Sequence, residues 1–375
     1  MKRILVFGMT ENPGGVENFL INYYRHINRD AVQFDFLCNT DQAVAYESEL
    51  KQLGARVYHI ISRRQNRKIF RSQLNGLFDT HAKEWDAIWV NVCSLANIDY
   101  LKTAKAYGIK RRIIHSHNSG NMEGVIRRVL HEWNKLSIHR FATDYWACSE
   151  EAAKWFYTNT GGKRILIIPN AIDTEHFQYD SGKREIVRRE YELKNQFVIG
   201  NIGRLHFQKN QSFLIDVFAE YSKKNDDAYL LLVGGGEDED KLKNKVKDIG
   251  LTNRVTFAGV QQDIAAFLDS FDLFIFPSLF EGLGIAALEA QANGMPVLLS
   301  EGCPPDVVVN GNVSRLPLSA GIDAWCREIA LLRRQGRDNI SDIENRFRAH
   351  GFDIKNEALR LEKLLTDERK IISDY

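Results

Sequence analysis

Short apolar runs alternate with amphipathic stretches along the chain, and this alternation restricts the fold more than any other feature. The apolar runs lie at residues 3–7, 33–38, 56–60, 87–92, 112–115, 145–148 and 165–168, and then at 197–202, 229–233, 255–257, 273–276 and 297–300. Between them, stretches such as 16–27 and 211–223 carry apolar residues at helical spacing. Strands that alternate with helices predict parallel sheets covered by helices on both faces.

The pattern of strand, glycine turn and helix starts at residue 3 and starts again near residue 197. We therefore expect an α/β chain of two Rossmann-like, doubly wound domains, residues 1–178 and residues 179–354, facing each other across a cleft. Ligands of such sheets bind at the carboxyl ends of the strands, which places the expected site in that cleft.

Composition excludes several classes of protein. The hydrophobic content of 44% and charged content of 26% are typical of a globular protein, and the net charge of +1 gives no bulk attraction to nucleic acid. The five cysteines lack metal-ligand spacing, which predicts no zinc site or disulfide framework and a reducing, cytoplasmic location. No run reaches the ~18 apolar residues of a spanning helix, and the apolar N-terminal run is too short for a signal peptide.

The most informative block follows the strand expected at 273–276. Glu281 and Glu289 stand eight positions apart, with Gly284 between them at the start of a helix expected over residues 285–293. Free N–H groups at that helix start favour an anion, and we expect Glu289 to lie about two turns along the helix. One carboxylate then meets the near end of an extended ligand and the other accepts hydroxyl hydrogen bonds farther along, which is the layout of a nucleotide diphosphate sugar.

Two cations follow the strand expected at 197–202. Arg204 comes directly after Gly203, and Lys209 leads into the next helix. Arg binds phosphate oxygens in pairs and Lys acts as a point charge, so together they suit a diphosphate and its charge as it departs.

Polar residues also follow strands of the first half. Gly14 and Gly15 precede a helix, where backbone can approach a ligand closely, although the spacing is not that of a dinucleotide fingerprint. His115 and His117 end another strand and can hold or move a proton. We prefer His117, which should lie farther out, and one of the two is expected to be a core histidine.

These elements together resemble the retaining GT-B glycosyltransferases of family four. The resemblance rests on the Glu-x7-Glu block, on Gly-Arg-Leu followed by Gln-Lys-Asn at 203–210, and on the glycine loop at 14–15. It implies that Glu289 binds the donor ribose, that Glu281 lies near the transferred sugar, and that the block between them holds sugar and phosphate.

The resemblance also assigns roles elsewhere. The donor-binding positions it implies are Gly14, Gly15, Gly203, Arg204, Lys209, Val260, Glu281, Leu283, Gly284, Ile285 and Glu289, and the catalytic ones are His117, Arg204, Lys209 and Glu281. Val260 is the expected contact to the base, and His117 the contact to the sugar or leaving phosphate, with His115 second. A helix within residues 355–375 is expected to return to the first domain.

The implied reaction moves a hexose or an N-acetylhexosamine from a UDP-sugar to a glycan or lipid-linked saccharide, as in bacterial capsule or exopolysaccharide biosynthesis, with retention of configuration. It implies no cofactor beyond the donor and no metal, since cations and helix amides take the metal's place. Basic patches at 63–71 and 110–112, with Ile69 and Phe70 interspersed, suggest peripheral contact with the inner face of the plasma membrane.

Two other functions fit the same residues. A nucleotide-sugar epimerase of this architecture would form product from the donor without an acceptor. A non-catalytic subunit of a polysaccharide assembly complex would neither bind nor turn over the donor, and retention of Arg204, Lys209, Glu281 and Glu289 together disfavours it.

Overall fold

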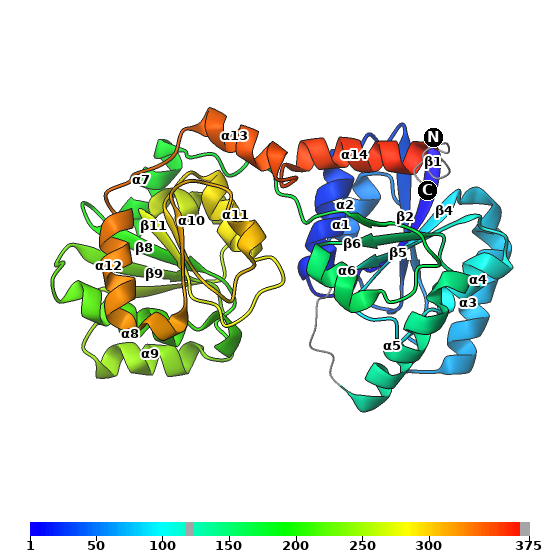
Figure 1. Cartoon of the computed structure of the whole chain (residues 1–375), viewed down its shortest axis with the longest axis horizontal. Coiled ribbons are helices and arrows are strands. Elements are labelled where there is room, and N and C mark those ends of the chain that lie inside the picture. The colour runs from blue at the N-terminus through cyan, green and yellow to red at the C-terminus, as the bar shows by residue number, and fades with distance from the viewer. Residues whose placement is uncertain (118–123, 368–375) are drawn as a thin grey trace. The chain divides into compact units, whose positions relative to one another are not determined.

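The structure is a computed structural model that describes residues 1–117 and 124–367. The chain divides into two compact units, Met1–Ala171 with Ile354–Tyr375, and Ile172–Asp353. Each unit is a parallel sheet with helices on both faces (Figure 1), so the predicted α/β class with two doubly wound domains is confirmed. The last eight residues of the helical segment expected at 355–375 lie outside the described residues.

The described part of the first unit contains a seven-stranded sheet in the order β3-β2-β1-β4-β5-β6-β7. Its strands are β1 (Lys2–Phe7), β2 (Val32–Cys38), β3 (Val57–His59), β4 (Ala87–Val92), β5 (Arg111–Ser116), β6 (Asp144–Ala147) and β7 (Ile165–Ile167). Its helices are α1 (Gly15–His26), α2 (Glu47–Gln52), α3 (Arg67–His81), α4 (Asp99–Ala106), α5 (Val125–Ser137), α6 (Glu150–Phe156) and α14 (Ile354–Thr366).

Both faces of this sheet are buried, because successive side chains of a strand point to opposite faces. Ile4 and Val6 of β1 pack in one apolar cluster with α1 and α14, whereas Leu5 packs in the opposite cluster with α3 and α4. Helix α14 lies against α1 and β2. Arg111 Nη1 donates to Leu364 O near the end of α14, at 2.7 Å.

The second unit contains a six-stranded sheet in the order β10-β9-β8-β11-β12-β13 among its described residues. Its strands are β8 (Phe197–Ile202), β9 (Ala228–Val233), β10 (Val255–Gly259), β11 (Leu273–Phe276), β12 (Val297–Ser300) and β13 (Val313–Leu316). Its helices are α7 (Ser181–Glu190), α8 (Gln211–Ser222), α9 (Glu239–Asp248), α10 (Ile264–Ser270), α11 (Ile285–Ala292), α12 (Ile322–Leu332) and α13 (Ile340–Ala349).

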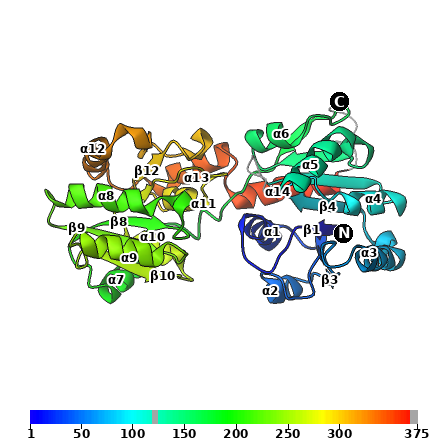
Figure 2. The same cartoon turned by 90° about the horizontal axis from the view of Figure 1, so that it is seen from below.

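Two apolar clusters enclose the second sheet as well. Helices α10, α11 and α13 bury their apolar residues on one face, and α8, α9 and α12 bury theirs on the other. Figure 2 shows the second unit from below, with its helices around the strands. The twelve strands predicted from sequence are all present, and β13 at the edge is an additional strand.

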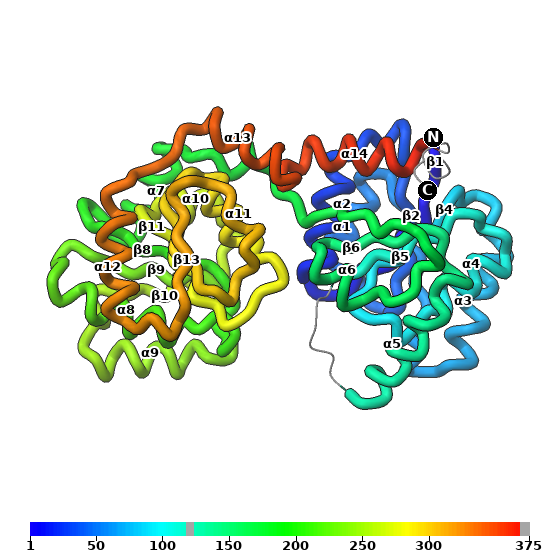
Figure 3. The backbone as a smooth tube through the Cα atoms, in the orientation of Figure 1, coloured from blue at the N-terminus to red at the C-terminus, as the bar shows by residue number. Residues whose placement is uncertain are grey.

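Each sheet has a point where the chain reverses the direction in which it adds strands. In the first unit this switch point lies between β1 and β4, and in the second it lies between β8 and β11. The path of the chain through both can be followed in Figure 3. Open α/β sheets bind ligands outside the carboxyl ends of the strands at such points.

Glycines bring two loops of the second unit into close contact beside β8. Leu205 N donates to Gly235 O at 3.0 Å, and a Cβ atom on Gly236 would lie only 2.2 Å from Leu205 O. We therefore expect Gly236→Ala to lower the free energy of unfolding by about 1 to 3 kcal/mol, because backbone must move to admit the methyl group.

The measurement is equilibrium unfolding in denaturant. Gly311→Ala in the same unit is the matched control, since its Cβ would meet nothing within 4 Å, and its stability should stay within about 0.5 kcal/mol of the wild type. Equal stability of the two variants would contradict the close approach.

Candidate active site

Two of the predicted elements meet at the switch point of the second unit. The segment after β8 ends in a short 3₁₀ turn, Phe207–Lys209, and the glutamate block follows β11. Because β8 and β11 are parallel neighbours, their carboxyl ends open on the same edge of the sheet. There Lys209 Nζ lies 2.7 Å from Glu281 Oε1, so residues 72 positions apart in sequence form an ion pair.

Hydrogen bonds fix the two loops to each other. Leu279 N donates to Gln208 O at 2.8 Å. The Gln208 side chain returns a bond from Nε2 to Phe280 O at 2.8 Å, and Asn210 Nδ2 donates to Pro277 O at 3.3 Å. The Gln-Lys-Asn triplet therefore holds the glutamate loop in place on both sides of Lys209.

The Lys209–Glu281 pair is largely removed from water. The side chain of Glu281 is 7% exposed and that of Lys209 is 21% exposed. The ammonium group also lies 4.8 Å from the ring centroid of Phe276, and Glu281 N donates to Gly302 O at 2.8 Å. The pair is thus a fixed charge arrangement rather than a mobile surface contact.

The start of α11 presents backbone donors beside this pair. Gly284 caps the helix with a φ of 84°, a conformation that favours glycine. Among the described residues, the amides of Leu283, Gly284 and Ile285 have no hydrogen-bond acceptor, while the side chains of Leu283 and Ile285 pack on the core. Their contribution to an anion would therefore come from backbone N–H groups.

Glu289 lies on the same helix. Because α11 begins at Ile285, Glu289 stands about one turn into the helix, and the expected distance of two turns is wrong. Its side chain is half-buried, and burial raises the pKa of its carboxyl to about 7. Among the described residues, none forms a hydrogen bond or ion pair with the Glu289 carboxylate that would offset its burial. Hydroxyl groups of a bound ligand would offset it.

Arg204 makes its ion pair with a residue that was not predicted. Its Nη2 lies 3.0 Å from Glu237 Oε2, and His206 Nε2 lies 3.2 Å from the other Glu237 oxygen. The Arg204 side chain is 69% exposed, so it is free to turn toward a ligand. Glu237 opens an acidic run, Glu237-Asp238-Glu239-Asp240, in which no sequence signal distinguishes it.

Val260 follows β10 and is highly exposed. A Cβ on Gly235 would lie 3.1 Å from one of its methyl groups, so Val260 stands next to the loop that holds Leu205. An exposed aromatic pair, Phe207 and Phe280, lies on the two clamped loops with ring centroids 6.2 Å apart. This pair cannot be singled out from sequence, because isolated aromatic residues in loops carry no spacing signal.

In the first unit, Gly14 caps α1 and Gly15 is its first residue. A Cβ on Gly15 would meet nothing within 4 Å, so backbone is open to approach there, whereas a Cβ on Gly14 would lie 2.9 Å from a Glu17 carboxylate oxygen. Glu17 is buried, and Thr10 Oγ1 donates to it at 2.6 Å. This carboxylate partly offsets the positive end of the helix.

The two histidines occupy different environments. His115 is fully buried against the rings of Phe19 and Trp89, as expected of a core histidine. His117 is half-buried, and its Nε2 lies 2.9 Å from Asn91 Oδ1. Burial lowers the pKa of His117 to about 3, so its imidazole is neutral near pH 7 and donates from Nε2 to Asn91.

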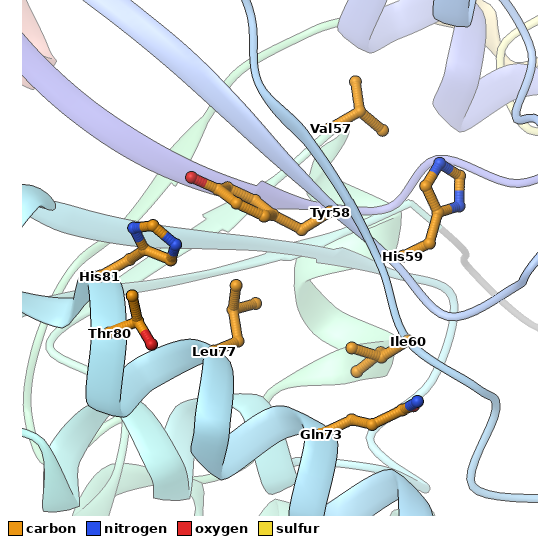
Figure 4. A pocket seen from close by; sticks show the side chains of 8 residues that line it. All are labelled: Val57, Tyr58, His59, Ile60, Gln73, Leu77, Thr80 and His81. Atoms are coloured by element: carbon orange, nitrogen blue, oxygen red, sulfur yellow. The ribbon is translucent and has the colours of Figure 1, made fainter.

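A surface depression of about 420 Å³ lies elsewhere in the first unit (Figure 4). Strand β3 and helix α3 line it, with Tyr58, His59 and His81 among the residues. None of the predicted site residues borders it, and β3 is an edge strand away from the switch point. We therefore place no function there.

The basic patches expected to contact a membrane are less available than the sequence indicates. Phe70 is fully buried, so it cannot enter a membrane, although Ile69 is exposed. Arg111 bonds to Asp144 at 3.1 Å, and Arg112 Nε donates to Phe141 O at 2.5 Å. These two arginines hold the first unit together rather than forming a free surface.

Two further features of the structure concern membranes and metal ions. Within residues 1–117 and 124–367, no helix is both long enough and apolar enough to cross a membrane. The same residues contain no group of three or more His, Cys, Asp or Glu side chains arranged to hold a metal ion.

Comparison with known families identifies the class of protein that this fold and site define. Residues 13–176 match the Glycosyltransferase Family 4 model, and residues 183–350 match the Glycosyl transferases group 1 model. The two matches together span most of the chain, and the chain is a GT-B glycosyltransferase of the group 1 and family 4 type.

Particular relatives agree. The chain is 28% identical to EpsF of Bacillus subtilis (strain 168), a provisionally named glycosyltransferase, over 94% of this chain and 93% of EpsF. It is 36% identical to the Escherichia coli UDP-Gal:alpha-D-GlcNAc-diphosphoundecaprenol alpha-1,3-galactosyltransferase over 40% of this chain and 38% of that enzyme. Anabaena Alr3699/HepE in complex with UDP-glucose has the same fold, with a TM-score of 0.71 and 22% identity over 98% of this chain and all of that one.

Proposed function

We propose that this glycosyltransferase moves a hexose or an N-acetylhexosamine from a UDP-sugar to a glycan or lipid-linked saccharide, with retention of configuration. The observation that carries the proposal is the clamped Lys209–Glu281 pair at the switch point of the second unit. Helix α11 follows it and carries the half-buried carboxyl of Glu289 about one turn from the helix start. Glu281, then Lys209 with the helix amides, then Glu289 match the sugar, the diphosphate and the ribose of a nucleotide-sugar.

In the proposed complex, Arg204 and Lys209 bind the diphosphate, Glu289 accepts the ribose hydroxyl groups, and Glu281 and the amides of Leu283, Gly284 and Ile285 meet sugar and phosphate. Gly203 leaves room for this approach, and Val260 contacts the base. From the first unit, Gly14 and Gly15 offer backbone, and His117 contacts the sugar or the leaving phosphate.

The proposed reaction proceeds on one face of the sugar. The bond between the anomeric carbon and the β-phosphate oxygen breaks, and UDP leaves with the bonding pair. The acceptor hydroxyl oxygen forms the new bond on the same face and gives its proton to the departing phosphate oxygen. Arg204 and Lys209 stabilise the charge that develops on the phosphate.

The biological setting is proposed from the relatives. EpsF is provisionally named a glycosyltransferase, and the Escherichia coli enzyme is named for a UDP-linked donor and a diphosphoundecaprenol-linked acceptor. By analogy, we place this chain in the cytoplasm, acting in capsule or exopolysaccharide biosynthesis on an acceptor held at the inner face of the plasma membrane.

A donor panel followed by acceptor assays tests the proposal. We expect one UDP-sugar to raise the melting temperature, since a ligand at ~100 times its Kd stabilises by ~2.7 kcal/mol. NMR of the product should then show the donor's own anomeric configuration. Inversion, or product formed without acceptor, would reject the proposed reaction.

We also expect EDTA to leave the initial rate nearly unchanged, within about twofold. Two protein cations and helix amides take the role that a divalent ion has in charge stabilisation. Initial rates with EDTA and with added Mg²⁺ or Mn²⁺ measure this, and a rate that disappears in EDTA and returns with the metal would contradict it. The chain needs no other cofactor under this proposal.

A further inference from the structure

Helix α5 of the first unit carries its apolar residues on the outside. They are Val125, Ile126, Val129, Leu130, Trp133 and Leu136, and each is between 38% and 79% exposed. At 100° per residue they occupy one continuous arc of the helix surface. Figure 1 shows α5 at the lower margin of the first unit. We call this arc the α5 face.

The opposite side of α5 is polar and binds the helix to the unit. His131 Nδ1 accepts a hydrogen bond from Leu95 N at 3.0 Å, and Asn134 Nδ2 donates to Leu95 O at 2.6 Å. Burial lowers the pKa of His131 to about 4, so its neutral ring can accept this bond, and it stacks on Trp155 at 4.7 Å. Rotating the helix to bury its apolar side would break these bonds.

This arrangement is the reverse of an ordinary surface helix, whose apolar side faces the core. Six large apolar side chains on one arc exceed the scattered exposure that is normal for a protein surface. The polar anchors and the apolar arc together indicate that the α5 face is an interaction surface that another molecule or a membrane covers.

Charge on the borders of the face selects an anionic membrane surface. Arg128 is exposed and lies beside the arc. Arg127 lies on the anchored side, where its Nε donates to Ser94 Oγ at 3.2 Å. The Glu132 carboxylate is paired with Lys135 Nζ at 3.5 Å, which leaves Arg128 as the uncompensated charge beside the face. Trp133 lies near the middle of the arc, and tryptophan favours the membrane interface. A helix with a basic border and an apolar face lies in the plane of such an interface.

We propose that α5 docks the enzyme on an anionic lipid bilayer, with the α5 face in the headgroup region and Arg128 against lipid phosphates. The proposal extends the membrane-linked acceptor of the proposed function, but the docking itself needs neither donor nor acceptor. It also moves the membrane contact from the basic patches of the sequence to a different helix.

Sedimentation of the full chain with vesicles tests the docking. The wild type should bind vesicles of phosphatidylcholine with one-third phosphatidylglycerol, and bind pure phosphatidylcholine less well. Trp133→Ser with Ile126→Ser should lower the partition coefficient at least about tenfold, because two interfacial anchors are lost. Arg128→Glu should weaken binding to the anionic vesicles only.

Leu359→Ser is the matched control, because Leu359 is an exposed apolar residue of α14 in the same unit. It should bind vesicles as the wild type does. All variants should keep the wild-type melting temperature and the donor-induced shift, which separates failure of docking from failure of the donor site.

Three results would overturn the proposal. The wild type could fail to bind anionic vesicles. The Trp133 and Ile126 double variant could bind them as well as the wild type does. The wild type could be a dimer by light scattering that the double variant converts to a monomer with vesicle binding unchanged, which would assign the α5 face to a second copy of the chain.

Discussion

Replacing Glu289 by Gln is expected to lower turnover of the UDP-sugar by about 10²- to 10⁴-fold while making the free protein more stable at pH 8. The loss follows because a carboxylate accepts charge-assisted hydrogen bonds from both ribose hydroxyl groups, each contributing about 1.5 to 3 kcal/mol, and an amide replaces an acceptor with a donor. Steady-state kinetics and donor titration measure the loss.

The gain in stability arises in the free protein, where the Glu289 charge has no ligand to offset its burial. Burial raises the pKa of Glu289 to about 7, above its value in the unfolded chain. The folded protein then binds more protons than the unfolded one between about pH 4.5 and 7, so stability falls as pH rises through that window and stays lowered above it. Glu289→Gln removes this charge, and we expect a gain of about 1 to 2 kcal/mol at pH 8 and almost none at pH 4.5.

The affinity for the donor should depend on the protonation of the same Glu289 carboxyl group. The ribose hydroxyl groups favour the charged carboxylate, so affinity is full above pH 7 and falls as pH drops below it. Glu185→Gln, an exposed glutamate of α7, is the control and should change neither stability nor affinity. Wild-type turnover in the Glu289→Gln enzyme would contradict the proposal that Glu289 binds the donor ribose.

The second large effect is expected for Arg204→Ala, which should lower turnover by about 10²- to 10³-fold. Arg204 is 69% exposed and pairs only with exposed Glu237 among the described residues, so the free energy of unfolding should stay within about 0.5 kcal/mol of the wild type. Stopped assays with the best donor, together with denaturant unfolding, measure both quantities.

Glu237→Gln tests the same ion pair from the other side. It breaks the contact to Arg204 but keeps the cation, so turnover should remain within a few-fold of the wild type. Lys209 is a less selective probe, because its removal leaves the nearly buried Glu281 carboxylate unpaired and destabilises the loop. If Arg204→Ala and Glu237→Gln lost turnover equally, the ion pair would have a structural role and the Arg204 cation would have no separate one.

Sequence periodicity was sufficient for most of the fold, because buried parallel strands are continuous apolar runs separated by helices. It missed β13, a four-residue edge strand of alternating Val313, Ser314, Arg315 and Leu316, which is too short to be separated from a loop. The contact between Lys209 and Glu281 was within reach of sequence reasoning, since both follow neighbouring parallel strands.

Other parts of the site depend on packing that no spacing encodes. Glu237 forms the ion pair with Arg204 because the loop at Gly236 packs closely against the loop at Leu205. The pKa of Glu289 depends on how deeply its helix is buried. Helix α5 shows the limit most clearly, because helical periodicity alone assigns its apolar side to the core, and only the bonds of His131 and Asn134 to Leu95 turn that side outward.

A crystal structure of the enzyme with an intact UDP-sugar is the measurement that bears most directly on donor recognition by the second unit. It should show the diphosphate within hydrogen-bond distance of Arg204 and Lys209, and the ribose hydroxyl groups on Glu289. Density for the nucleotide at any other place, with these three side chains untouched, would contradict the account.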